Sequence, residues 1–469
     1  MTPYDIVRER YLLPFDLRQY QADEVNILAP EPRVGFYWEP GAGKTAGSTV
    51  WALYWHLRGE ASQWAVLVPP ILLYQWQRWL SSIIDLRTGR YLECTVYYGP
   101  PKKRHTLPLD SLFTVSTYAM FKNDFDRLEA AWADRPVGGL CDEATAIKNI
   151  ETDNHKAVRT MFEARPLALL TGTPINKPTD AYAYIRLVAP HVYRNQRQFN
   201  KLHVAEFDDY DNPKTYANLD LLAQNMQINT SRILIREVAN FLPPVIYTPI
   251  HYELDPAHLK LYKRIADERL VEFEGREAVD AISASAVRSA LQQVVVNWGE
   301  FDEDPDRRPA VLDLIEETLE ELGDSKLVVV ANFQRTNRYL LRMLAKYGAV
   351  AIYGETTPAG RQEALRAFIE DPSCRVIQLQ PSSAGFGVDG LQAVCHNMLF
   401  VEAPTTPTPF EQVVKRLDRD GQKFPVNVRV AVAKSTVQVG MFRDLLENDE
   451  LAGKVQRSHK SLKELVNGE

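Results

Sequence analysis

The chain has 469 residues, 45% of them apolar, which is enough for two large domains with sizeable cores. Its formal net charge is −7, so the molecule as a whole does not attract the phosphates of nucleic acid. Binding to nucleic acid would therefore require basic residues concentrated on one face. The four cysteines form no CxxC pair, which indicates reduced structural thiols and no zinc site: Cys94, Cys141, Cys374 and Cys395.

The N-terminal sequence "MTPYDIVRER" lacks an apolar signal core, and no apolar run reaches the length of a membrane span. The chain contains no low-complexity segment and no short repeat. We therefore expect a soluble, globular protein of the cytoplasm.

Short apolar runs alternate with helix-length amphipathic segments in the first half of the chain. The runs predict buried strands at residues 33–38, 64–70, 111–117, 137–144 and 166–174. This rhythm is typical of a parallel sheet covered by helices, so the first half predicts an α/β lobe.

A more polar stretch, residues 186–245, separates this series from a second one. It contains "FDDYDNPK", which predicts an exposed insertion, and it ends at Pro243-Pro244, where we expect a hinge. Residues 255–295 are charged and helical in pattern. A second α/β lobe follows, with strands predicted at 326–333, 350–354, 375–380, 396–403 and 427–434.

The sequence "EPGAGKT" (39–45) follows one of these strands and begins a helix, which is the arrangement that a phosphate-binding loop requires. Lys44 would reach the β- and γ-phosphates of a nucleotide, and Thr45 would ligate Mg²⁺. The alternative is a glycine turn before an ordinary helix, and Trp38 stands where the strict pattern has glycine. The candidate nucleotide-binding residues are Pro40, Gly41, Ala42, Gly43, Lys44 and Thr45.

A second pair of candidate residues ends the apolar strand in "GGLCDEATAIKN". Asp142 would bind the magnesium ion through its water shell, and Glu143 would orient and deprotonate the attacking water. An Asp-Glu pair after a strand is otherwise a common helix cap. Its occurrence together with GKT favours the catalytic interpretation.

"DEATAIKN" resembles the DEAH-box element of superfamily 2 helicases and translocases, and "IKN" resembles the Swi/Snf-like branch, although Thr145 replaces its histidine. "EQVVKRLDRDGQ" (411–422) matches the pattern Q-x-x-x-R-x-x-R-x-G-Q of the same branch. The resemblance covers residues 12–435 and implies two tandem RecA-like lobes. The compact form is similar to phage-encoded DNA branch-migration helicases.

The spacing of Arg416 and Arg419 in this second element predicts that both lie on one face of a helix. Two guanidiniums that face a cleft between the lobes can stabilise charge on a transferring γ-phosphoryl group. The alternative is a surface helix of mixed charge, which is common but does not explain why every fixed position fits.

The resemblance implies roles for further residues. Gln21, in "LRQYQ", would read the edge of adenine, and Asp389, in "GFGVDG", would contact the ribose or couple the lobes. Thr171 and Thr173, in "LLTGTPINK", would relay the nucleotide state. Phe386 replaces a glycine of the family pattern and has no assigned role. The candidate nucleic-acid contacts are Pro69, Thr117, Asn332 and Ser382, whereas Trp76 is expected to pack in a core.

These predictions divide the chain into four segments. Residues 1–190 form lobe 1, which binds ATP, and residues 191–245 form an insertion with the linker between the lobes. Residues 246–445 form lobe 2, including the helical stretch 255–300, and residues 446–469 form a basic tail helix with Lys454, Arg457, Lys460 and Lys463. Lobe closure on ATP and Mg²⁺ would move the protein along one strand of duplex, forked or branched DNA through sequence-independent phosphate contacts.

We expect a monomeric DNA translocase or helicase that unwinds forks or migrates branches, acting in the host cytoplasm if it is phage-encoded. Residues 191–230 are the expected place for an element that separates strands. Two alternatives remain open. One is an RNA helicase of the same superfamily, and the other is a nucleotide-gated clamp that binds DNA without moving along it.

Overall fold

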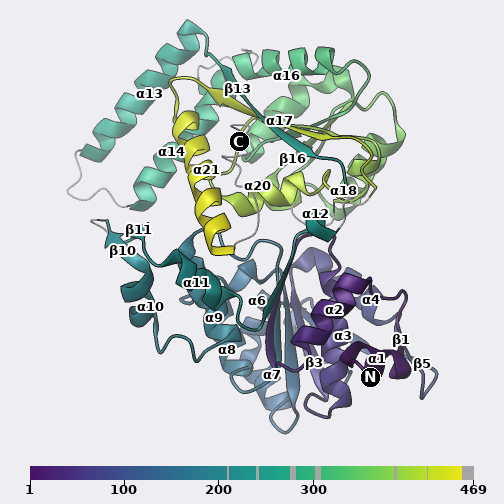
Figure 1. The fold of residues 1–469 in the computed structure, drawn as a ribbon. Coiled ribbons are helices and arrows are strands. Elements are labelled where there is room, and N and C mark those ends of the chain that lie inside the picture. Colours follow the sequence, from purple (N-terminus) through teal and green to yellow (C-terminus); the bar gives the residue numbers. More distant parts are fainter. Residues whose placement is uncertain are drawn as a thin grey trace. The chain divides into compact units, whose positions relative to one another are not determined.

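The computed structural model describes residues 1–208, 211–238, 242–274, 281–301, 308–384, 388–419 and 421–456. The chain divides into two units, residues 1–240 with 452–458 and residues 241–451 with 459–469, and each is considered by itself (Figure 1). Phe386 and the end of the predicted basic tail, including Arg457, Lys460 and Lys463, lie outside the described residues. Within the described part of the chain, no helix combines the length and apolar character needed to cross a membrane.

The first unit is built on a parallel sheet with the strand order β12-β2-β9-β8-β3-β7-β6. The predicted strands are present as β2 (Arg33–Trp38), β3 (Gln63–Val68), β7 (Phe113–Thr117), β8 (Val137–Asp142) and β9 (Leu167–Leu170). The sequence did not predict β6 (Cys94–Tyr97) or β12 (Thr230–Ile233). The edge strand β12 is short and more polar than the others, which explains why the apolar pattern missed it.

Helices cover both faces of this sheet because alternate residues of its strands are buried on each side (Figure 1). One face packs against α1 (Pro3–Arg10), α2 (Gln19–Leu28), α3 (Lys44–Leu57) and α4 (Leu73–Leu80). The other packs against α6 (Tyr118–Asn123), α7 (Phe125–Ala131), α8 (Asp153–Met161) and α9 (Ala181–Val188).

Smaller elements complete the first unit. Short strands β1 (Tyr11–Leu12), β4 (Ile84–Asp85) and β5 (Arg90–Tyr91) form an antiparallel sheet, and the insertion contributes a hairpin of β10 (Val204–Phe207) and β11 (Pro213–Tyr216). The remaining helices and 3₁₀ turns are α5 (Pro101–Arg104), α10 (Gln196–His203), α11 (Leu219–Met226), α12 (Ile235–Val238), η1 (Pro70–Leu72), η2 (Ala144–Ile147) and η3 (Pro178–Asp180).

The second unit has a parallel sheet with the order β13-β18-β17-β14-β16-β15. Its predicted strands are β14 (Leu327–Val330), β15 (Val350–Ile352), β16 (Val376–Leu379), β17 (Asn397–Phe400) and β18 (Val426–Ala433), and β13 (Val245–Tyr252) is an additional edge strand. Both units are therefore parallel sheets between helical layers, which confirms the predicted α/β class with tandem RecA-like lobes.

The core of the second unit also has two sides. On one face the sheet packs against α18 (Pro358–Glu370), α20 (Pro407–Val414) and the part of α21 (Val437–Gln456) that precedes residue 452. On the other it packs against α13 (Pro256–Glu274), α14 (Ala281–Val296), α16 (Ala310–Glu321) and α17 (Gln334–Met343). Short helical segments are α15 (Trp298–Phe301), α19 (Pro381–Ala384), η4 (Ala345–Tyr347) and η5 (Leu391–Ala393).

Candidate nucleotide-binding site

Three candidate segments meet at one edge of the first sheet. The strands β2, β9 and β8 are parallel neighbours, so their carboxyl ends lie side by side. The loop 39–43 follows β2, Thr171 and Thr173 follow β9, and Asp142 and Glu143 end β8. In an open α/β sheet this edge is where ligands bind.

The loop between β2 and α3 has the backbone of a phosphate-binding loop. Gly41 and Gly43 have φ of +90° and +91°, a left-handed conformation that favours glycine. A Cβ atom on Gly43 would lie 2.1 Å from Nε2 of Gln21, so a side chain there would also collide. Gly43 is the N-cap of α3, which leaves the first backbone N–H groups of a 14-residue helix at this loop.

Trp38 departs from the strict loop pattern without disturbing this geometry. Its ring is fully buried, packs beside Gly47 and donates from Nε1 to Oγ of Ser231 at 2.8 Å. Only its backbone faces the loop, where the carbonyl accepts from Nζ of Lys44 at 2.8 Å. The tryptophan therefore occupies the core, and the departure leaves the phosphate side of the loop unchanged.

Lys44 and the acidic residues are electrostatically close. Burial lowers the pKa of Lys44, and the carboxylates of Glu143, Asp142 and Glu39 act in the opposite direction. Thr45 is half-buried at the start of α3 beside Lys44. The structure thus brings the predicted loop lysine and the predicted acidic pair into one charged cluster.

Asp142 is held in place by two hydrogen bonds and is only 6% exposed. Its Oδ2 accepts from the indole Nε1 of Trp76 at 2.7 Å, and its Oδ1 accepts from the backbone N–H of Glu143 at 2.9 Å. Burial raises the pKa of Asp142, whereas Lys44 and these two donors favour the ionised form.

Glu143 adopts a left-handed backbone conformation with φ of 48° and ψ of 56°. This conformation is costly for a glutamate, and strained backbone of this kind clusters at functional sites. The hydroxyl of Tyr118 donates to the backbone carbonyl of Asp142 at 2.8 Å, which fixes the peptide immediately before Glu143. The strained turn directs the chain away from β8 at the point where the sequence predicts the catalytic base.

The turn after β9 packs directly on the phosphate loop. A Cβ atom on Gly172 would lie 2.7 Å from Cδ of Pro40, so the two segments are in close contact. The backbone N–H of Thr173 donates to Oγ1 of Thr171 at 3.3 Å. Arg232 of β12 donates from Nη1 to the carbonyls of Gly172 at 2.7 Å and Tyr37 at 3.2 Å, so it ties this turn to the end of β2.

Gln21 lies against the phosphate loop, and its contacts are with the protein itself. Its Nε2 donates to the carbonyl of Ala42 at 2.8 Å, and its Oε1 accepts from the backbone N–H of Arg18 at 2.8 Å. Gln21 therefore supports the loop from α2. Recognition of adenine by this residue stays a prediction.

The two arginines of the second unit are not on one face of a helix, so that prediction is wrong. The helix α20 ends at Val414, and the next residues form successive turns in which Arg416 N–H donates to the carbonyl of Val413 at 3.0 Å. Such i→i+3 bonds tighten the chain at the end of a helix, and the sequence spacing alone does not reveal this.

Both arginines nevertheless contact the segment that carries Asp389. Arg419 forms an ion pair with Asp389 at 3.1 Å, and Arg416 Nη1 donates to the carbonyl of Val388 at 3.3 Å. The structure thus brings together three candidate residues of the second unit.

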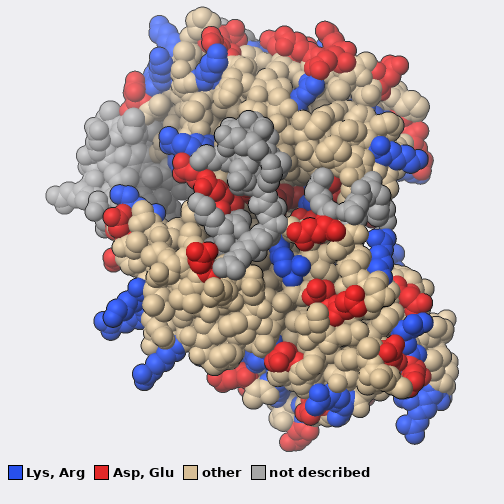
Figure 2. All heavy atoms as spheres, viewed as in Figure 1, with Lys and Arg blue, Asp and Glu red and all other residues tan. Residues whose placement is uncertain are grey.

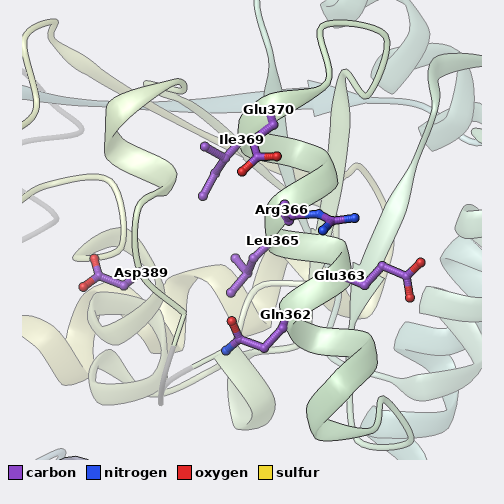
Figure 3. A pocket seen from close by; sticks show the side chains of 7 residues that line it. All are labelled: Gln362, Glu363, Leu365, Arg366, Ile369, Glu370 and Asp389. Carbon is purple, nitrogen blue, oxygen red and sulfur yellow. The ribbon is translucent and has the colours of Figure 1, made fainter.

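A hollow of about 500 Å³ lies beside Asp389, between its loop and helix α18. Figure 3 shows Leu365 and Ile369 of α18 pointing toward the Asp389 loop, whereas the carboxylate of Asp389 points away from the helix. Its lining combines acidic residues with a single basic residue, Arg366, and places no cluster of basic groups opposite Asp389, so we assign no ligand to this hollow.

The four candidate nucleic-acid contacts have different surroundings. Thr117 is 3% exposed and caps α6 by accepting from the N–H of Met120 at 3.1 Å. Pro69 is half-buried before η1, Asn332 is half-buried after β14, and Ser382 is exposed on α19. Their contacts with nucleic acid stay predictions.

The charge distribution gives no single basic patch on the face drawn in Figure 2. Lys and Arg side chains are interspersed there with Asp and Glu. The expected concentration of basic residues is therefore not found on that face.

The donor set at the edge of the first sheet suits Mg²⁺ together with nucleotide phosphates. Among the described residues, no group of three or more His, Cys, Asp or Glu side chains could hold a metal ion. The hydroxyl of Thr45 would supply a hard oxygen ligand, and the carboxylate of Asp142 would hold a water ligand of the ion, since Mg²⁺ commonly combines one or two protein oxygens with phosphates and water. The glycine-lined loop and Lys44 fit the phosphates.

A family model described as the SNF2-related domain matches residues 36–297, more than half of the chain. The chain belongs to this family. The match includes the phosphate loop, the acidic pair and the turn after β9. This confirms the Swi/Snf-like resemblance, whereas the likeness to the phage-encoded form stays a prediction.

Individual relatives are distant. An uncharacterized ATP-dependent helicase of Mycoplasma pneumoniae is 24% identical over 93% of this chain and 42% of its own length. The DNA repair and recombination protein RAD54B of Gallus gallus is 24% identical over 92% of this chain and 53% of its own length. The chain thus spans about half the length of these curated relatives.

A solved structure, the Sulfolobus solfataricus SWI2/SNF2 ATPase core in complex with dsDNA, is also similar. It has 21% identity and a TM-score of 0.45, and the match covers 90% of this chain and 88% of that chain.

Several residues that shape the site carried no sequence signal. Trp76 lies within a pattern that predicts core packing, and Arg232 lies within a pattern that predicts a polar insertion.

Glu402 of the second unit also gave no sequence signal. It follows β17, is fully buried, and accepts from the N–H groups of Asn332 at 2.8 Å and Phe333 at 3.1 Å and from Oγ1 of Thr336 at 2.6 Å. Burial raises the pKa of Glu402 to about 7.

Proposed function

We propose that the chain is a nucleic-acid-dependent ATPase that moves along DNA. The observation that carries this proposal is the cluster of Lys44, Asp142 and Glu143 at the carboxyl edge of the first sheet. Membership of the SNF2-related family supports it, as does similarity to an ATP-dependent helicase and to a DNA repair and recombination protein.

In this proposal the residues of the first unit hold the nucleotide and prepare the attacking water. The loop N–H groups and Lys44 bind the phosphates, and Asp142 and Thr45 hold Mg²⁺, which would neutralise phosphate charge. Glu143 orients the water and accepts its proton.

Arg416 and Arg419 of the second unit supply positive charge as the phosphoryl group transfers. Hydrolysis therefore requires the two units to close on ATP, and repeated closure advances the protein along one strand. Fork unwinding and branch migration are both outcomes of such movement. Contacts with DNA phosphates suit this movement because they are independent of base sequence, so no particular sequence would stop the protein.

The test compares ATP hydrolysis by the parent and by Lys44→Ala with single strand, duplex, fork, four-way junction and RNA. We expect stimulation by one of the DNA forms and no turnover by Lys44→Ala with any of them. Stimulation by RNA alone would favour the RNA-helicase alternative. DNA-stimulated hydrolysis without displacement of a bound triplex strand would favour the clamp.

Salt dependence provides a second test of the phosphate contacts. DNA affinity should fall steeply between about 50 and 200 mM salt and differ little among sequences of one shape. A flat response to salt, or a strong preference for one sequence, would contradict the proposed mode of binding.

A further inference from the structure

The indole N–H of Trp76 makes a contact that a purely apolar core residue would not make. The side chain is 2% exposed, and its ring packs in the core between α4 and the sheet. Its Nε1 donates to Oδ2 of Asp142 at 2.7 Å. This is a short hydrogen bond to a buried carboxylate, so it belongs to the stronger class of charge-assisted bonds.

We propose that Trp76 is a positioning residue that orients the Asp142 carboxylate for the metal-bound nucleotide. The inference rests on the proposed ATPase function. A carboxylate oxygen has two lone pairs, so the N–H of Trp76 uses one site on Oδ2 and leaves another for a water ligand of the metal. The second oxygen, Oδ1, is fixed by the N–H of Glu143.

The two bonds together restrict rotation of the carboxylate about its side-chain torsions. Without the indole donor, Oδ2 would be buried with one fewer partner, and the carboxylate could turn toward Lys44, which attracts it electrostatically. Groups that orient a metal ligand from behind typically change metal affinity or activity 10- to 100-fold when removed.

The same helix offers a matched control. Trp79 of α4 also donates from its Nε1, at 3.0 Å, but its acceptor is the hydroxyl Oγ1 of Thr49 in α3. Trp76→Phe and Trp79→Phe therefore each remove one indole N–H from α4 and keep an aromatic ring. They differ in whether the lost bond ends on Asp142, the carboxylate that would hold the water ligand of the metal.

The experiment measures the affinity of ADP for the full chain by calorimetry, with Mn²⁺ as the metal probe and with the metal chelated. We expect Trp76→Phe to bind ADP without metal as the parent does. The gain in affinity that Mn²⁺ produces should fall about 10- to 100-fold in Trp76→Phe and stay near the parent value in Trp79→Phe.

A merely structural role of Trp76 gives a different result, because ADP binding with and without Mn²⁺ would then fall together. That result, or an unchanged effect of Mn²⁺ in Trp76→Phe, would overturn the inference while the parent still hydrolyses ATP. A parent that binds no ADP, or whose ADP affinity does not respond to Mn²⁺, would overturn the proposed function and the inference with it. Thermal unfolding of both variants reports whether each ring substitution preserves the fold.

Discussion

Replacement of Glu402 by glutamine should remove a pH dependence from the stability of the second unit. The carboxyl group is fully buried, receives three hydrogen bonds and has its pKa raised to about 7 by burial. Glutamine has the shape of the protonated acid. Its carbonyl can accept from the two backbone N–H groups, and its NH₂ can donate to the hydroxyl of Thr336.

The sign and size of the effect follow from proton binding. Between the ordinary pKa of 4.5 and the folded value of about 7, the folded state holds the proton of Glu402 more tightly than the unfolded state does. The contribution to stability is therefore greatest at low pH and is lost as the pH rises through this window. The difference in pKa corresponds to about 3 kcal/mol, of which roughly 2.5 kcal/mol falls between pH 5 and pH 8.

The assay is urea unfolding of the parent and of Glu402→Gln from pH 5 to pH 8, with hydrogen exchange in β14 and β17 reporting on the second unit. Other groups titrate equally in both proteins, so the difference between them isolates Glu402. We expect the stability of the parent to fall relative to Glu402→Gln by roughly 2.5 kcal/mol as the pH rises. A difference that stays constant across this range would refute the reasoning.

Three further predictions concern both units. Glu143→Gln should bind ATP with near-normal affinity but hydrolyse it about 10²- to 10⁴-fold more slowly, which single-turnover kinetics and equilibrium binding together would check. Arg419→Ala should lower kcat much more than it weakens ATP binding, and Arg419→Lys should rescue poorly because an ammonium lacks the planar fork; parent-like hydrolysis by both would exclude this role. Asp124→Asn should destabilise the first unit by roughly 1–3 kcal/mol, because it removes the carboxylate that accepts two hydrogen bonds from Arg104 at a partly buried position; a thermal unfolding midpoint equal to that of the parent would contradict this.

The apolar pattern predicted every central strand because those strands are buried on both faces and read as continuous apolar runs. It missed the edge strands β6 and β12, whose residues alternate between half-buried and buried positions, and the edge strand β13, whose residues are half-buried or exposed. The phosphate loop was predictable because Gly41 and Gly43 have a backbone requirement that shows in the sequence.

The supporting contacts of the site were not predictable in the same way. The bonds of Trp76 to Asp142 and of Arg232 to the turn after β9 join residues far apart in the chain, and neither residue type reveals its partner. The spacing of Arg416 and Arg419 suggested a helix face, but the helix ends before them. A three-residue spacing places two side chains on one face only if the helix extends over both residues.

The edge strand β12 gives the phosphate loop a second connection to the chain. Glu39 donates its N–H to the carbonyl of Ile233 at 2.9 Å, and its Oε2 accepts from the N–H of Ile235 at 2.9 Å. Ile235 begins α12, the last helix before the chain enters the second unit. The connector between the units is thus anchored at its origin to the residues that precede Gly41. A ligand that displaces Glu39 would also strain or break the two hydrogen bonds that fix the beginning of α12, so the shape of the loop and the first turn of this helix are linked within the first unit.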